Sequence, residues 1–148
     1  MDQKATKTAL AEAACGYTFQ DRDILWEALQ ASGNGVTRAG SRSIPNGNKP
    51  LAMIGDPVIK ALINTQSYED GCSRGEMNNR LQDIESNANL ARVGEAHGFE
   101  NFINGNPSQR GRIQPRLYQD TVEALVAGAF IDGGINAAKT VMTALGLL

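Results

Sequence analysis

The sequence predicts an all-α fold, and two features support this class. Apolar residues recur at helical spacing along almost the whole chain, and no alternating stretch longer than about four residues is typical of a strand. The chain has 148 residues, 41% of them apolar, which is the size of one domain and enough to bury roughly 70% of the unfolded surface. We therefore expect a single helical domain over residues 1–148.

Two helices are predicted near the N-terminus. The first covers residues 5–14 and ends at Gly16, because glycine suits the left-handed conformation that closes a helix. Asp21 caps the second, which runs to residue 31. Residues 32–48 are dense in Gly, Ser, Asn and Pro and have few apolar side chains to bury, so we expect a long flexible loop there.

The remaining helices follow from apolar periodicity and end signals. Residues 50–68 form the most apolar stretch and are predicted to be the central helix of the core. Shorter helices are expected over 75–85 and from residue 86 or 87 to 97. A further helix should begin at Pro115 and end at residues 133–134, and a last amphipathic helix over 136–145 follows it.

Charge and cysteine usage exclude several classes of function. With 14 Lys and Arg against 16 Asp and Glu, the net charge of −2 excludes a uniformly basic nucleic-acid surface or a polybasic membrane anchor, but not a local basic patch. Cys15, Cys72 and the single His97 cannot assemble a Cys/His zinc site. The sequence shows no signal peptide and no apolar run near the ~18 residues of a membrane span. We expect a soluble intracellular protein, located in the cytoplasm unless an organelle imports it.

Three carboxylates interrupt segments that should be apolar. Asp120 and Glu123 are three residues apart, so both project from one helix face, and Asp56 lies in the most apolar helix. An unpaired buried carboxylate is costly, and Lys60 is the one basic residue expected nearby. If the two helices pack together, a divalent cation would offset the charge, and oxygen-only ligation favours Mg²⁺ or Mn²⁺.

A second interpretation of these acids stays open at this point. In it, Asp56 caps a helix that restarts at Pro57, while Asp120 and Glu123 are first-turn acids stabilised by the helix dipole. Spacing alone is compatible with both interpretations.

Four segments, in order, resemble the ribonuclease III family. LAEAACGYTFQDRDILWEALQAS is similar to the opening of that family's endonuclease domain, and LAMIGDPVIKALI resembles its signature helix, usually LEFLGDAVL. RGEMNNRLQDIESNANLARVGEAHGFENFI is similar to the stretch that follows, and DTVEALVAGAFIDGG to the second acidic motif, usually D-x-x-EA-x-x-GA-x-x-LD-x-G. The resemblance covers residues 5–148 apart from 32–48.

This resemblance implies a ribonuclease III-like helical bundle that dimerises and cuts double-stranded RNA to leave 5′-phosphate ends. It implies that Asp56, Asp120 and Glu123 bind Mg²⁺, with Mn²⁺ as a substitute, and that Asp56 and Glu123 are catalytic. Met53 falls on the position that plugs the partner subunit, although an ordinary core methionine is the alternative. No double-stranded-RNA-binding domain is expected, so RNA affinity would come from the homodimer or from a ribosomal or RNA-processing partner.

The sequence departs from the family at the predicted site. Ala52 stands where the signature has a metal-site Glu, and Lys49 and Arg74 stand where members commonly carry acids. A catalytically silent RNA-binding or ribosome-associated scaffold of the same fold is therefore the alternative function.

The basic residues near the acidic motifs are candidate contacts to RNA phosphates, because guanidinium and ammonium groups bind the phosphate backbone. These candidates are Lys49, Arg74, Arg110, Arg112 and Arg116. For the three arginines that precede the second acidic motif, a solvated loop is the alternative interpretation.

Overall fold

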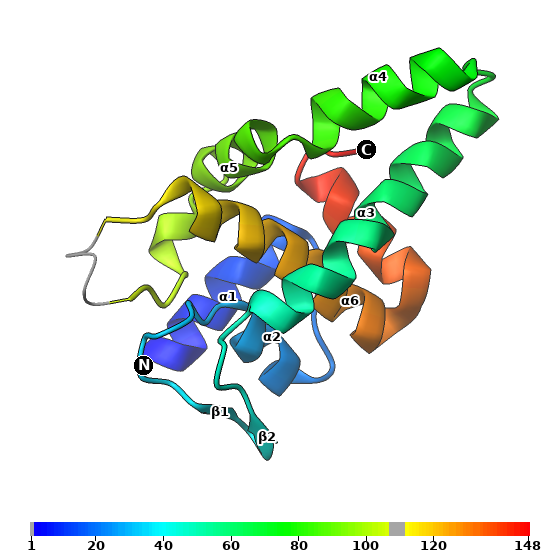
Figure 1. Cartoon of the computed structure of the whole chain (residues 1–148). Helices are drawn as coiled ribbons and strands as arrows, with labels where there is room; N and C mark the ends of the chain where they lie inside the picture. Colours follow the sequence, from blue (N-terminus) through cyan, green and yellow to red (C-terminus); the bar gives the residue numbers. More distant parts are fainter. Residues whose placement is uncertain (1, 107–111) are drawn as a thin grey trace.

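The computed structural model describes residues 2–106 and 112–148, and it confirms the all-α class (Figure 1). In chain order the elements are α1 (Gln3–Cys15), α2 (Arg22–Ala28), β1 (Arg38–Ala39), β2 (Arg42–Ser43), α3 (Lys49–Glu69), α4 (Arg74–Glu85), α5 (Asn87–Ala96), the 3-10 turn η1 (Phe99–Asn101) and α6 (Pro115–Ala144). In these residues, no helix is both long enough and apolar enough to cross a membrane.

Helix α6 is the centre of the fold, and the prediction that residues 50–68 form the central helix is wrong. Every residue of α6 from 120 to 129 is buried, because α1, α2, α3 and α5 all pack against this helix. Helix α3 buries one face, with Leu51, Ile59 and Ile63 at helical spacing. The outer face of α3 also carries apolar side chains, and these are exposed to solvent.

Helices α3 and α6 touch at Gly55. A methyl group added there would overlap the carbonyl oxygen of Glu123, so a side chain at this position would push the two helix backbones apart. The helix continues from Lys49 to Glu69 through Pro57, and the predicted restart at that proline is therefore wrong.

The C-terminal helices are predicted with the correct boundary. Helix α6 bends at Gly134, whose φ of 80° and ψ of −167° are not helical, so the element consists of two helical parts. These parts correspond to the two helices predicted over 115–134 and 136–145.

The segment 32–48 contains a short hairpin, in which Arg38 pairs with Ser43. The prediction of a flexible loop without strands or buried residues is therefore wrong, because Ile44 and Asn48 are also buried. The Asn48 amide donates to the carbonyl of Ala28 at 2.9 Å and to the Thr121 hydroxyl at 3.1 Å. Polar side-chain contacts therefore hold a segment that has few apolar residues of its own.

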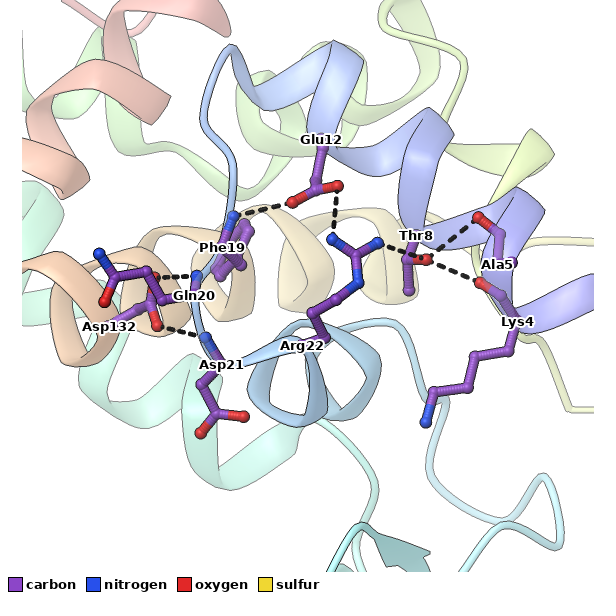
Figure 2. Close-up of polar contacts among 9 residues, drawn as sticks. All are labelled: Lys4, Ala5, Thr8, Glu12, Phe19, Gln20, Asp21, Arg22 and Asp132. Atoms are coloured by element: carbon purple, nitrogen blue, oxygen red, sulfur yellow. Dashed lines mark hydrogen bonds and ion pairs between the residues drawn. The ribbon is translucent and has the colours of Figure 1, made fainter.

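A second polar network fastens the α1–α2 junction to α6 (Figure 2). The Asp132 carboxylate accepts the backbone N–H groups of residues 20–21 at 2.9 and 2.8 Å, and also the Tyr17 hydroxyl at 2.6 Å. Burial raises the pKa of Asp132, but these hydrogen bonds outweigh it and leave the pKa below its usual value. Arg22 donates to Glu12 at 3.0 Å in the same network.

Candidate active site

A cleft of about 880 Å³ opens between the first half of α3, the start of α6 and the α4–α5 junction. Its ionisable lining residues are the acids Asp56, Glu85, Asp120 and Glu123 and the bases Lys49, Lys60 and Arg116. The structure thus brings the three predicted acids into one cleft, although they come from helices far apart in the sequence. Three cationic groups against four carboxylates leave the cleft nearly charge-balanced.

Asp120 lies inside α6 and has two cationic partners. Its side chain is only 6% exposed, with Arg116 Nε 3.0 Å from Oδ1 and Lys49 Nζ 3.6 Å from Oδ2. Arg116 is one helical turn before Asp120, and Lys49 is the first residue of α3. The expectation that Lys60 is the one basic residue near these acids is therefore wrong.

Asp56 is paired on the opposite side of the cleft. Lys60 Nζ lies 3.0 Å from its Oδ2 and 3.6 Å from Oε2 of Glu85, the last residue of α4. The hydrogen bond to Asp56 raises the pKa of Lys60. Because Asp56 lies in the middle of an unbroken α3, its predicted role as a cap is wrong.

Among the three predicted acids, Glu123 is the one without an ion pair in the described part of the chain. Burial, together with the nearby Asp56 and Asp120 carboxylates, raises its pKa to about 7, although a hydrogen bond from Gln119 and the charge of Arg116 act in the opposite direction. As the sixth and ninth residues of α6, Asp120 and Glu123 lie beyond the first turn, and the first-turn interpretation is wrong. A cation bound beside Glu123 would relieve the repulsion that raises its pKa.

The carboxylates are not arranged as a preformed metal site. Within residues 2–106 and 112–148, no group of three or more His, Cys, Asp or Glu side chains is placed to hold a metal ion. Ala52 lines the cleft with a methyl group and supplies no oxygen. In this arrangement, Asp56 and Asp120 instead contact Lys60, Lys49 and Arg116.

The other predicted site residues lie apart from this cleft or at its edge. Met53 is 79% exposed, so its alternative role as an ordinary core methionine is wrong. Arg74 and Arg112 are exposed, but neither lines the cleft, and Arg110 lies outside the described residues. Glu85 was not predicted, because it is 29 residues from Asp56 and no local pattern marks it. The pairing of Arg116 with Asp120, in contrast, has the i, i+4 spacing of a helical ion pair and could have been predicted.

The chain is similar in sequence to a known protein family and in fold to a solved structure. A family model described as ribonuclease-III-like matches residues 21–146. Among curated relatives, the proteins named Ribonuclease 3 from Agrobacterium fabrum and Phenylobacterium zucineum are 29% identical over 141 residues and 28% identical over 144 residues. The matches cover 91% and 94% of this chain, which spans 56% and 59% of the length of those relatives.

A solved structure shares the arrangement of helices. The nuclease domain of ribonuclease III from Campylobacter jejuni matches with a TM-score of 0.77 over 92% of this chain and 93% of its own, at 19% identity. The Campylobacter jejuni domain has structural flexibility in a region involved in dimer formation. At this identity the likeness shows the fold.

Proposed function

This chain belongs to the ribonuclease III-like family, and from that premise we propose that it is a divalent-metal-dependent endoribonuclease. Its substrate is double-stranded RNA, whose phosphodiester bonds are cut to leave 5′-phosphates. The observation that supports this function is the gathering of Asp56, Asp120 and Glu123 from two helices in one cleft.

The chemistry of the donor set fits Mg²⁺, with Mn²⁺ as a substitute. Asp56, Asp120 and Glu123 offer oxygen atoms alone, which hard divalent cations prefer. The pKa of Glu123 is raised by burial first and then by the Asp56 and Asp120 carboxylates, whose negative charge such an ion offsets. When bound, the ion supplies an activated water and stabilises the departing oxygen. Ala52 offers no oxygen, so a bound ion would complete its ligands there with water.

The cationic residues of the cleft bind the substrate. Lys49 and Arg116 begin α3 and α6 at the rim, with side chains 51% and 69% exposed, and so reach phosphates that the acids would repel. Arg74, Arg110 and Arg112 remain predicted contacts to the RNA backbone, and Arg74 and Arg112 lie outside the cleft. Because A-form RNA is recognised by shape and phosphates, little sequence specificity is expected.

We assign the homodimer interface to an exposed apolar patch. The patch consists of Met53, Ile54, Phe130, Ile131 and Ile135. Ile54 and Ile131 line one pocket. Exposed apolar side chains of this kind are typical of a protein contact, and Met53 has the flexible side chain to fill a socket on a second copy.

Sedimentation analysis tests the dimer. Met53→Asp should convert the wild-type dimer to a monomer, because a charge replaces the most exposed residue of the patch. Tyr68→Asp is the matched control, since Tyr68 is also exposed on α3 but lies about 22 Å along the helix from Met53. A Met53→Asp protein that still sediments as a dimer contradicts this interface.

A catalytically silent RNA-binding domain is the second candidate. The observation that favours it is the pairing of Asp56 and Asp120 with basic side chains, together with the missing oxygen at Ala52.

Cleavage of labelled double-stranded RNA in Mg²⁺, and separately in Mn²⁺, distinguishes the two candidates. If the chain is the proposed enzyme, the wild type cleaves the RNA and Glu123→Ala does not. The control Asp83→Ala keeps the activity, because Asp83 is an exposed acid outside the cleft. An inert wild type combined with an active Ala52→Glu variant supports the silent domain, because one added carboxylate would then restore the site.

A further inference from the structure

Both oxygens of Asp120 are engaged by cations that the protein itself supplies. Arg116 Nε lies 3.0 Å from Oδ1 and Lys49 Nζ lies 3.6 Å from Oδ2. In the described part of the chain, neither cation pairs with another acid. A dication that is to contact either oxygen of Asp120 must therefore displace one of these two positive groups, which also repel it.

The same two side chains are free to move without disturbing the core. Lys49 and Arg116 occupy the first turns of their helices and lie at the rim of the cleft, more than half exposed, whereas Asp120 is buried beneath them. An exposed lysine or arginine exchanges partners by rotating its side chain. Asp120, in contrast, keeps its place in the buried centre of α6.

We propose that Lys49 and Arg116 couple RNA binding to divalent-metal binding at Asp120. RNA phosphates draw the two cations away, and the uncovered carboxylate then accepts the ion. This inference rests on the proposed function, because it takes RNA and a divalent cation as the ligands of the cleft.

Charge and geometry predict that RNA strengthens metal binding rather than weakening it. A guanidinium group binds phosphate through two parallel hydrogen bonds, so Arg116 exchanges one carboxylate contact for a stronger pairing. Once both cations contact RNA, Asp120 and Glu123 are left with uncompensated negative charge that attracts a dication. By thermodynamic reciprocity, the ion must in turn tighten RNA binding, since it keeps Lys49 and Arg116 off Asp120.

Titration calorimetry with Mn²⁺ in the absence of RNA tests the competition. The double variant Lys49→Gln/Arg116→Gln should bind Mn²⁺ about tenfold more tightly than wild type, within the range typical of coupled sites. Adding Asp120→Asn to the double variant should remove the gain. The control Arg92→Gln/Lys139→Gln removes two exposed charges outside the cleft and should bind as wild type. Equal affinities in wild type and the Lys49/Arg116 variant overturn the proposal.

A second titration tests the coupling to RNA. A phosphorothioate RNA duplex is used, because it keeps the backbone charge and resists hydrolysis. With saturating duplex at low salt, wild type should bind Mn²⁺ about tenfold more tightly, while the double variant should show no RNA-dependent gain. Circular dichroism confirms that each variant is folded.

The two proposals fail in different ways. A wild type that binds the duplex but shows no gain in Mn²⁺ affinity overturns the coupling and leaves the proposed function in place. A wild type that binds no duplex at low salt overturns both.

Discussion

Replacing Gly55 by Ala should destabilise the protein, although alanine is the better helix former. The added methyl group would overlap the Glu123 carbonyl oxygen and lie 2.5 and 2.9 Å from the carbonyl carbon and Cα of the same residue. Carbon atoms pack favourably at about 3.5–4.0 Å, so α3 and α6 must separate locally by about 1 Å.

The expected magnitude follows from two opposing effects. Overpacking of this kind costs about 1–3 kcal/mol, and more when the obstacle is backbone, because no side-chain rotation can relieve it. Separation of the helices also weakens the packing of Leu51, Ile59 and Ile63. The higher helix propensity of alanine compared with glycine offsets about 1 kcal/mol of this loss. We therefore expect a net loss of about 2 kcal/mol in the free energy of unfolding, or a fall of about 4–8 °C in Tm.

Urea denaturation followed by circular dichroism measures this loss. Gly75→Ala is the matched control, because a methyl group there meets open space in the first turn of α4, and this variant should equal or slightly exceed wild type in stability. A Gly55→Ala protein as stable as wild type would refute the close backbone approach that brings Asp56 and Glu123 into one cleft.

Three other variants test polar contacts of the fold and site. Asp132→Asn should lower the free energy of unfolding by about 1–2 kcal/mol at neutral pH, because it removes the charged acceptor of the Tyr17 hydroxyl and of two backbone amides. The wild type should also lose stability as the pH falls through the lowered pKa of Asp132. A variant that loses stability in acid just as the wild type does would contradict this prediction. Asn48→Ala should cost about 1–3 kcal/mol in urea denaturation, since it leaves the Thr121 hydroxyl and a buried carbonyl without this donor; a neutral effect would argue against the anchor. Glu123 holds its proton up to a pH of about 7 when folded but to about 4.5 when unfolded, so the free energy of unfolding of wild type should fall as pH rises through that window. Denaturation at several pH values should show a flatter profile in Glu123→Gln, and parallel profiles would count against the raised pKa.

The acids of the candidate site were recognisable because they break an apolar pattern. Asp56, Asp120 and Glu123 interrupt segments whose other residues have the apolar pattern of a protein core. Their spacing along a helix predicts the helix face from which each side chain projects. Their partners were harder to predict. Lys49 is 71 residues from Asp120, and Glu85 is 29 residues from Asp56, so only the packing of α3, α4 and α6 places these charges together.

The main error in the predicted fold concerned which helix is central. Residues 50–68 and 115–134 are both rich in apolar residues, and hydropathy does not separate a helix covered on all sides from one with an exposed apolar face. Met53 and Ile54 belong to such a face on α3. The anchoring of residues 32–48 was missed for a related reason, since the buried Asn48 is held by hydrogen bonds that composition does not reveal.

Local periodicity, capping residues and motif spacing were enough to predict the helical class, most helix ends and the three acids that line the cleft. The pairing of the charges depends instead on helix packing, since Asp120 meets Lys49 through the crossing of α3 and α6 at Gly55. Charge pairing depends on distances across that crossing, and no local pattern in the chain encodes them.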